Sequence, residues 1–109
     1  MVIQPGGASV GIALSANTTS ASTAIPPLSN GDNPKWVYVA FSDTSNSITT
    51  GGIRFGVGTV AAATAANTMG LSNDAPIIVN VAGNEEYTAI ADAACSLSVT
   101  PLAGIVPGG

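Results

Sequence analysis

The chain is poor in groups that carry charge. Its 109 residues include no histidine, two cations (Lys35 and Arg54) and six acidic residues, so charged residues make up 7%, against about 25% in an ordinary soluble domain. Most enzymes need a titratable group with a pKa near neutral pH, usually a histidine, a tuned carboxylate or lysine, or an activated thiol. We therefore expect no catalytic site, and a function that depends on the surfaces presented to neighbouring molecules.

The shortage of cations bears on two further classes of partner. The net charge is −4, and two cations cannot neutralise a run of phosphates, so no nucleic-acid binding is expected. Binding to an anionic membrane surface requires clustered Lys and Arg, and no apolar run approaches the ~20 residues that span a bilayer. No basic and apolar leader follows Met1, which favours assembly in a cytoplasm.

The chain also lacks the residues that usually hold cofactors, metals or disulfides. Cys95 is the single cysteine, which excludes an intramolecular disulfide, and no neighbouring cation or histidine lowers its pKa. We interpret it as a small buried apolar residue. A Ser-His-Asp relay is impossible without histidine, and we expect no cofactor.

Small residues dominate what is present. Ala, Gly, Ser and Thr together supply 53 of the 109 residues, and only 31 residues are large and apolar (Val, Ile, Leu, Met, Phe, Trp or Tyr). A core of that size is modest, because small domains bury a low share of their surface. We infer that part of the apolar surface is buried between subunits, since association adds stability that a small core lacks.

Short alternating segments predict a single all-β domain over residues 1–109. Val10–Leu14 alternates apolar and small residues, and 35–41 is apolar on both faces, which is typical of a central strand. Alternation also predicts a strand near residues 53–57, where glycines indicate a bulge or a close backbone approach. Further strands are expected at 77–81, 85–91 and 96–100, and Pro101 is expected to end the last of them. Residues 15–24 form either a polar strand or a loop. Residues 59–70 form either a helical turn or a loop. Residues 1–9 and 102–109 are expected as extended arms. These elements predict a β-sandwich or jelly-roll-like barrel of about seven short strands.

Three polar motifs favour structural roles. Glu85 and Glu86 are adjacent, so in a strand they face opposite sides and cannot act together on one substrate. Asn30, Asp32 and Asn33 form a turn signal without the further oxygen ligands that calcium requires, so no metal site is expected. The glycines around Arg54 are not followed by a helix or the Lys-Ser/Thr of a phosphate-binding loop.

Over about residues 35–101 the chain resembles small auxiliary virion proteins of tailed bacteriophages. The resemblance depends on an ordered set of segments: Trp36-Val37-Tyr38-Val39-Ala40-Phe41, Ile53-Arg54-Phe55-Gly56, Pro76-Ile77-Ile78-Val79, the run from Ala82 to Ile90, and Leu97-Ser98-Val99-Thr100-Pro101. It implies a β-sandwich-like cement or decoration protein, often trimeric, that binds the major capsid protein on the outside of the capsid. It also implies a place in the virion, assembly in the host cytoplasm and no catalytic site. Residues 1–34 lie outside it.

Two alternative functions remain open at the level of sequence. One is another phage part, in the tail or at the head-to-tail connection. The other is a carbohydrate-binding β-sandwich in which Trp36, Tyr38 or Tyr87 stacks on a sugar. The candidate residues for contact with a shell or a second subunit are Trp36, Arg54, Leu102, Ile105 and Val106.

Overall fold

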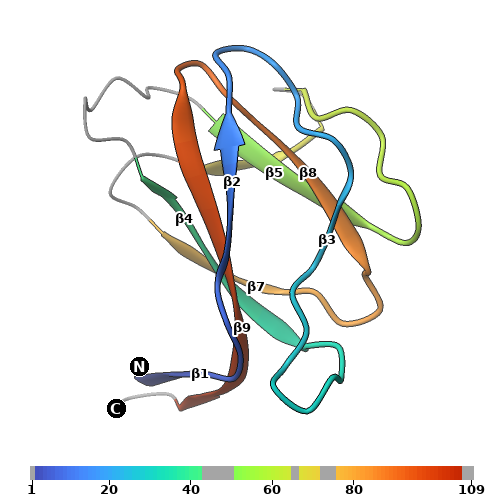
Figure 1. Cartoon of the computed structure of the whole chain (residues 1–109), viewed down its shortest axis with the longest axis vertical. Coiled ribbons are helices and arrows are strands. Elements are labelled where there is room, and N and C mark those ends of the chain that lie inside the picture. Colours follow the sequence, from blue (N-terminus) through green and yellow to red (C-terminus); the bar gives the residue numbers. More distant parts are fainter. Residues whose placement is uncertain (1, 43–50, 65–66, 72–75, 107–109) are drawn as a thin grey trace.

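Alternating apolar residues form the strands of two antiparallel sheets that pack face to face (Figure 1). The computed structural model describes residues 2–42, 51–64, 67–71 and 76–106. Sheet A contains β1 (Val2–Pro5), β2 (Val10–Leu14), β4 (Trp36–Ser42), β7 (Ile77–Asn80) and β9 (Cys95–Val106). Sheet B contains β3 (Thr23–Ala24), β5 (Gly51–Gly56), β6 (Met69–Leu71) and β8 (Glu86–Ala91).

The predicted all-β sandwich is confirmed. Within the described residues there is no helix, and hence none that could cross a membrane.

The long strand β9 organises sheet A. On one side it pairs with β4, which in turn pairs with β7, so β4 is the central strand that its composition predicts. On its other side β9 pairs first with β2 and then, nearer its end, with β1. Sheet B has the order β3-β8-β5-β6. The chain passes from the edge of sheet A at β2 to the edge of sheet B at β3, so one segment borders both layers.

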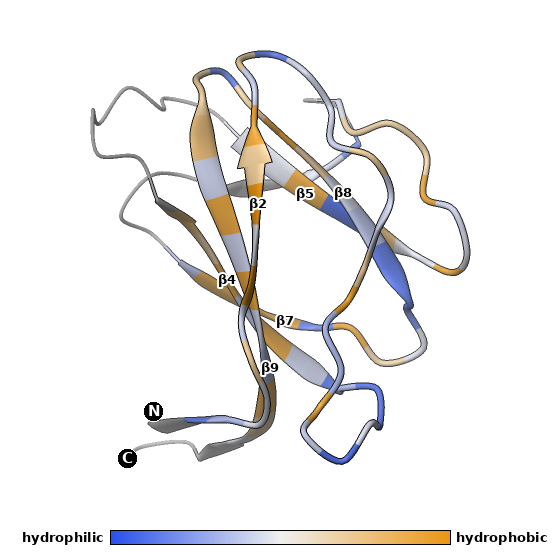
Figure 2. Ribbon diagram, in the orientation of Figure 1, coloured by the Kyte–Doolittle hydropathy of each residue, from blue (hydrophilic) through white to orange (hydrophobic). Residues whose placement is uncertain are grey.

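The core lies between the sheets. Sheet A contributes Val37, Val39 and Leu97, each with an exposed fraction of 0%, because alternate residues of a strand point to the same side. Sheet B contributes Ile53 and Tyr87, also at 0%. The alternation is visible along β9 as bands of high and low hydropathy (Figure 2). Burying a side chain of this kind stabilises the fold by about 1.5–3 kcal/mol.

Strand β9 does not end at Pro101, which corrects the expectation drawn from its missing N–H group. The carbonyl of Pro101 accepts a hydrogen bond of 2.8 Å from the N–H of Gly6. That side of β9 is where pairing changes from β2, which ends its register at Val99, to β1, which begins at Leu102. Because the N and C=O groups of a strand residue point to the same side, the missing donor falls in this gap, and the ladder with β4 is not interrupted.

In the described parts of the two segments expected as extended arms, β1 and the last part of β9 are strands that pair with each other. Val2, Ile3 and Gln4 pair with Val106, Ile105 and Gly104, so β1 lies beside the last part of β9 (Figure 1). The last part of the predicted arm, residues 107–109, lies outside the described residues.

Residues 57–64 lie across the outer face of sheet B. Thr88 points outward from β8, yet its exposed fraction is 1%, and its hydroxyl donates a hydrogen bond of 2.8 Å to the carbonyl of Ala61. At an outward position of β5, a Cβ on Gly56 would lie 3.2 Å from Cγ2 of Val60. The segment is therefore a loop that rests directly on the sheet, and the glycines of β5 permit the close approach that the sequence indicates.

Serine and threonine hydroxyls hold this loop in place. Ser22 Oγ accepts a hydrogen bond of 2.9 Å from the N–H of Val60 and donates one of 2.8 Å to Oε1 of Glu86. Thr19 Oγ1 accepts a hydrogen bond of 2.8 Å from the N–H of Ala63. We call these contacts the hydroxyl clasp. They satisfy loop amides that would otherwise be buried without a partner.

Candidate interaction face

The strands of sheet A carry no charged residue, whereas those of sheet B carry Arg54 and Glu86. Sheet A therefore has an outer face built from uncharged side chains. Because charged residues are depleted at the centre of protein interfaces, a sheet face of this kind is suited to contact with another protein.

Three large side chains stand on the outer face of sheet A. The register places Trp36 and Tyr38 of β4 on the side opposite the buried Val37 and Val39, and Ile78 of β7 lies directly beside Tyr38. All three are half-buried. We call Trp36, Tyr38 and Ile78 the aromatic face. A tryptophan and a tyrosine held on a rigid strand lose little conformational entropy on binding, which is why these residue types often dominate the affinity of interfaces.

The β9 positions next to this face are Leu102, which lies opposite Trp36 and is buried, and two polar residues. Thr100 of β9 lies beside Tyr38 on the side away from Ile78, and Ser98 lies beside Ala40. Thr100 Oγ1 and Ser9 Oγ share a hydrogen bond of 2.6 Å. The aromatic face is therefore bordered by hydroxyl groups that can hydrogen-bond to a partner without a strong desolvation cost.

Of the predicted contact residues, Trp36 alone lies on the aromatic face. Arg54 lies on β5 in the other sheet, so the structure does not bring the two together. Leu102 is 2% exposed, which leaves its side chain covered within the chain itself. Ile105 and Val106 lie in β9 opposite Ile3 and Val2 of β1, and their side chains fall outside what the structure describes.

No family model matches the chain, and the searches of curated proteins and of solved structures likewise found no match.

A pocket of about 350 Å³ has Arg54 among its lining residues. Asn67, Asn80 and Asn84 contribute amide groups to its wall, and the other lining residues are apolar: Ile53, Phe55, Met69 and Val79. Arginine can bind a carboxylate, since it presents a planar fork of donors to the two oxygens. Arg54 is half-buried and is the one cation among the described lining residues.

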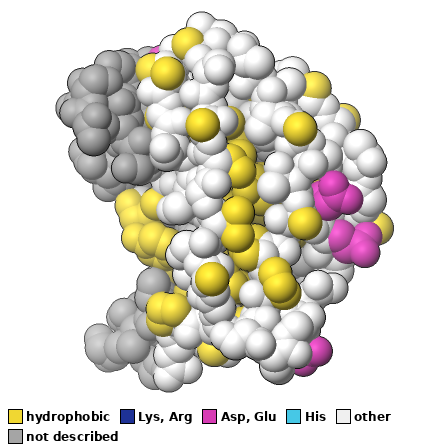
Figure 3. Space-filling model, viewed as in Figure 1, with side chains coloured by type: hydrophobic (Ala, Val, Ile, Leu, Met, Phe, Trp, Pro, Cys, Tyr) yellow, Lys and Arg dark blue, Asp and Glu magenta, His cyan; other side chains and the backbone are white. Residues whose placement is uncertain are grey.

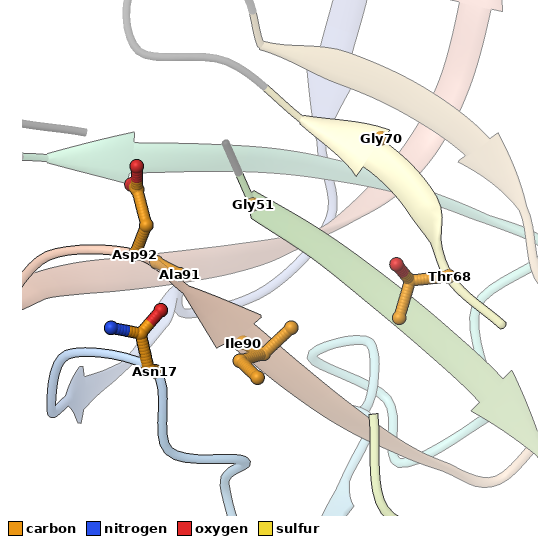
Figure 4. Close-up of a pocket in the computed structure, with 7 residues that line it drawn as sticks. All are labelled: Asn17, Gly51, Thr68, Gly70, Ile90, Ala91 and Asp92. Atoms are coloured by element: carbon orange, nitrogen blue, oxygen red, sulfur yellow. The ribbon is translucent and has the colours of Figure 1, made fainter. Parts of the chain in front are cut away.

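A second pocket, of about 330 Å³, lies at the end of β8 (Figure 4). Asn17 and Asp92 lie at one end and Thr68 at the other, with Ile90 between them. Asn17 has a φ of 56°, a conformation that asparagine tolerates better than most residues, and its N–H donates a hydrogen bond of 2.7 Å to the carbonyl of Ala91. The described lining residues include no aromatic side chain.

The acidic motifs occupy structural positions. Oε1 of Glu85 accepts a hydrogen bond of 3.1 Å from the N–H of Gly58, while Glu86 belongs to the hydroxyl clasp. The turn at residues 30–32 is confirmed, because the Asn30 side chain both donates to Asp32 Oδ2 (3.1 Å) and accepts from the N–H of Asp32 (3.0 Å). Among the residues that the structure describes, no three His, Cys, Asp or Glu side chains gather in one place.

Tyr87 is buried in the core, which removes it from the set of residues that might stack on a sugar. Its exposed fraction is 0%, and its ring packs against Phe55 with a centroid separation of 6.1 Å. Within the described part of the chain its hydroxyl has no hydrogen-bond partner. Burial raises the pKa of the Tyr87 phenol, because the charged phenolate is disfavoured away from water.

We expect Tyr87→Phe to raise the free energy of unfolding by about 1 kcal/mol, since the substitution removes a buried hydroxyl that lacks a partner. The gain should grow at alkaline pH. Above a pH of about 10 the phenol loses its proton in the unfolded chain but keeps it in the folded chain, so the original protein loses stability as pH rises. Urea denaturation at pH 7 and pH 10.5 tests this, and a variant less stable than the original at both values would show that the hydroxyl has a partner.

The sequence did not identify Ile78 or the residues of the hydroxyl clasp. In the segment 77–79 all three residues are apolar, so the pattern does not reveal which one faces outward. The clasp joins residues far apart in sequence, as with Ser22 and Val60. The one available signal was the abundance of Ser and Thr in 15–24, a segment with too few large side chains to be held by packing.

Proposed function

We propose that this chain is a non-enzymatic structural protein of a virion, which binds the outside of a phage capsid and stabilises it as a cement or decoration protein. Its partners are the major capsid protein and further copies of itself. The observation that carries the proposal is the aromatic face, a set of large half-exposed side chains on a sheet without strand charges. The resemblance of residues 35–101 to small auxiliary virion proteins of tailed bacteriophages supports the choice of a phage particle.

The proposed mechanism is stabilisation by mass action. A protein that binds assembled shell subunits, and does not bind dispersed ones, shifts the equilibrium toward the assembled shell. The rigid strands β4 and β7 present the aromatic face without a folding step, which reduces the entropic cost of binding. Arg54 offers a separate contact to a carboxylate of a neighbour.

The first test is the number of copies of this chain per particle. Quantitative mass spectrometry of purified phage particles from the source should find a ratio to the major shell protein near one. A handful of copies per particle would instead favour a tail or head-to-tail component, and absence from particles would overturn the proposal.

We expect the double variant Trp36→Ser/Tyr38→Ser to bind purified shells at least about tenfold more weakly than the original chain, because central aromatic residues commonly contribute most of the affinity of an interface. Co-sedimentation with shells measures the loss. Val57→Ser is the matched control, since Val57 is 70% exposed and lies outside the aromatic face. Circular dichroism confirms that both variants fold, and equal binding by the two would remove the aromatic face from the proposal.

The carbohydrate-binding alternative keeps one observation in its favour: Trp36 and Tyr38 are two residues apart on the same face of β4 and are both half-exposed. Because Trp36 is the single tryptophan, its fluorescence reports directly on a ligand that stacks there. A saturable change on titration with bacterial glycans would favour this alternative.

A further inference from the structure

Strand β2 is an edge strand whose outer side pairs with no described strand. It pairs with β9 alone, through Val10 opposite Val99 to Leu14 opposite Cys95. Val10 is 38% exposed, and Gly11 and Ala13 are exposed as well. The side of the molecule that carries β2 shows a stripe of hydrophobic side chains down its middle (Figure 3).

This edge has none of the features that usually prevent sheets from pairing with each other. Natural edge strands are protected by shortness, proline, a bulge or a charged side chain. The other described edge strands each have one. β1 contains Pro5 and an irregular register, β7 directly follows Pro76, and β3 and β6 have two and three residues. β2 has five residues, no proline and a regular register, and the first charged residue of the chain is Asp32.

The sequence of β2 is complementary to itself. If two copies pair antiparallel about Ile12, Val10 of one lies opposite Leu14 of the other, and Gly11 lies opposite Ala13. Val10, Ile12 and Leu14 share the inner side of sheet A with the buried Leu97 and Val99, so this register keeps every large apolar side chain on the inner side. The small residues remain together on the outer side. No charge on either strand opposes the contact.

We propose that β2 pairs with β2 of a second copy of this chain, across a two-fold axis at Ile12. The pairing joins two copies of sheet A into one continuous sheet, satisfies the outward backbone groups of both edges and covers Val10. A partner strand for β2 should be uncharged and should place its apolar residues opposite those of β2 and its small residues opposite the small ones. A second copy of β2 does both. The inference does not depend on binding to a capsid, because it concerns an edge of sheet A and not the aromatic face.

The first measurement is the mass of the full chain in solution at about 50 µM by light scattering coupled to size exclusion. The expected value is twice the 10.6 kDa of one chain. A single-chain mass would overturn the proposal, because β2 would then be unpaired or would pair only with a strand of a different protein. A three-chain mass, the state implied by the resemblance to phage proteins, would also overturn it.

Two charge variants test the register. Gly11→Lys/Ala13→Lys places lysines directly opposite each other twice across the two-fold axis, and like charges in such positions destabilise the pair. Gly11→Glu/Ala13→Lys places opposite charges at the same two positions. A side chain at residue 11 is accommodated, because its Cβ would meet only the Leu97 carbonyl at 3.9 Å.

The dissociation constant of the dimer should rise about tenfold or more in the first variant and stay within a few-fold of the original in the second. Circular dichroism establishes that both variants fold. If both dissociate equally, or if both remain dimeric, the pairing of residue 11 with residue 13 is incorrect and the proposal fails.

Discussion

Gly52→Ala should lower the free energy of unfolding by about 2–3 kcal/mol, because the added methyl group has no space on the covered side of β5. A Cβ at this position would overlap the Thr68 hydroxyl, and it would lie 2.5 Å from Thr68 Cβ and 3.0 Å from the Met69 carbonyl oxygen. Rotation of the Thr68 side chain cannot relieve the contact with its Cβ or with the backbone. The sheet and the residues above it must therefore move apart. The midpoint of chemical denaturation measures the loss.

The matched control lies on the neighbouring strand. Gly70 is the residue paired with Gly52 across β5 and β6, and nothing lies within 4 Å of the position its Cβ would occupy. Gly70→Ala should therefore change the free energy of unfolding by no more than about 0.5 kcal/mol. If the two variants were equally stable, the residues that follow the loop would not be packed against β5.

Ser22→Ala should lower the free energy of unfolding by about 2 kcal/mol, because one hydroxyl serves two partners. The substitution leaves the N–H of Val60 without its acceptor and Glu86 without its donor, and both contacts are partly buried. Beyond the loss of global stability, we expect faster amide hydrogen exchange at Val60, since the loop can then open locally.

Ser9→Ala is the control for this second prediction. It also removes a side-chain hydrogen bond, between Ser9 and Thr100, but that contact is exposed and water can replace it. A loss of less than about 0.5 kcal/mol is expected there. Equal losses in Ser9→Ala and Ser22→Ala would mean that the hydroxyl clasp is no stronger than an ordinary surface contact.

The sequence predicts the main strands because the pattern of apolar side chains within each short segment is enough to indicate a strand. The run from Trp36 to Phe41 is apolar on both faces and becomes the central strand β4. The glycines around Arg54 correctly indicated a close approach, although the sequence does not say that residues 57–64 are the approaching segment. The missing N–H of Pro101 predicts the end of a strand, but β9 continues because that N–H would point to the side where its pairing changes from β2 to β1.

The candidate site was less predictable because it depends on which face of a strand is covered. In β8 the alternation places Tyr87 and Ala89 on one side and Thr88 on the other, but it does not identify the inner side. Both sides proved buried, since the loop covers Thr88. The sequence identified Trp36 as a candidate contact, but only the pairing of β4 with β7 brings Ile78 beside Tyr38.

The central place of β9 has a consequence for the order in which the chain can fold during synthesis. Strands β1, β2 and β4 all pair with β9, which is the last described strand to leave the ribosome. Until it emerges, the earlier strands of sheet A have no partner on that side, and their apolar residues remain open to other nascent chains. Sheet A then forms by pairing strands that are distant in sequence, which favours slow folding. We expect sheet A to form only once β9 has been made, with the time before β9 is available as the period of greatest risk of aggregation.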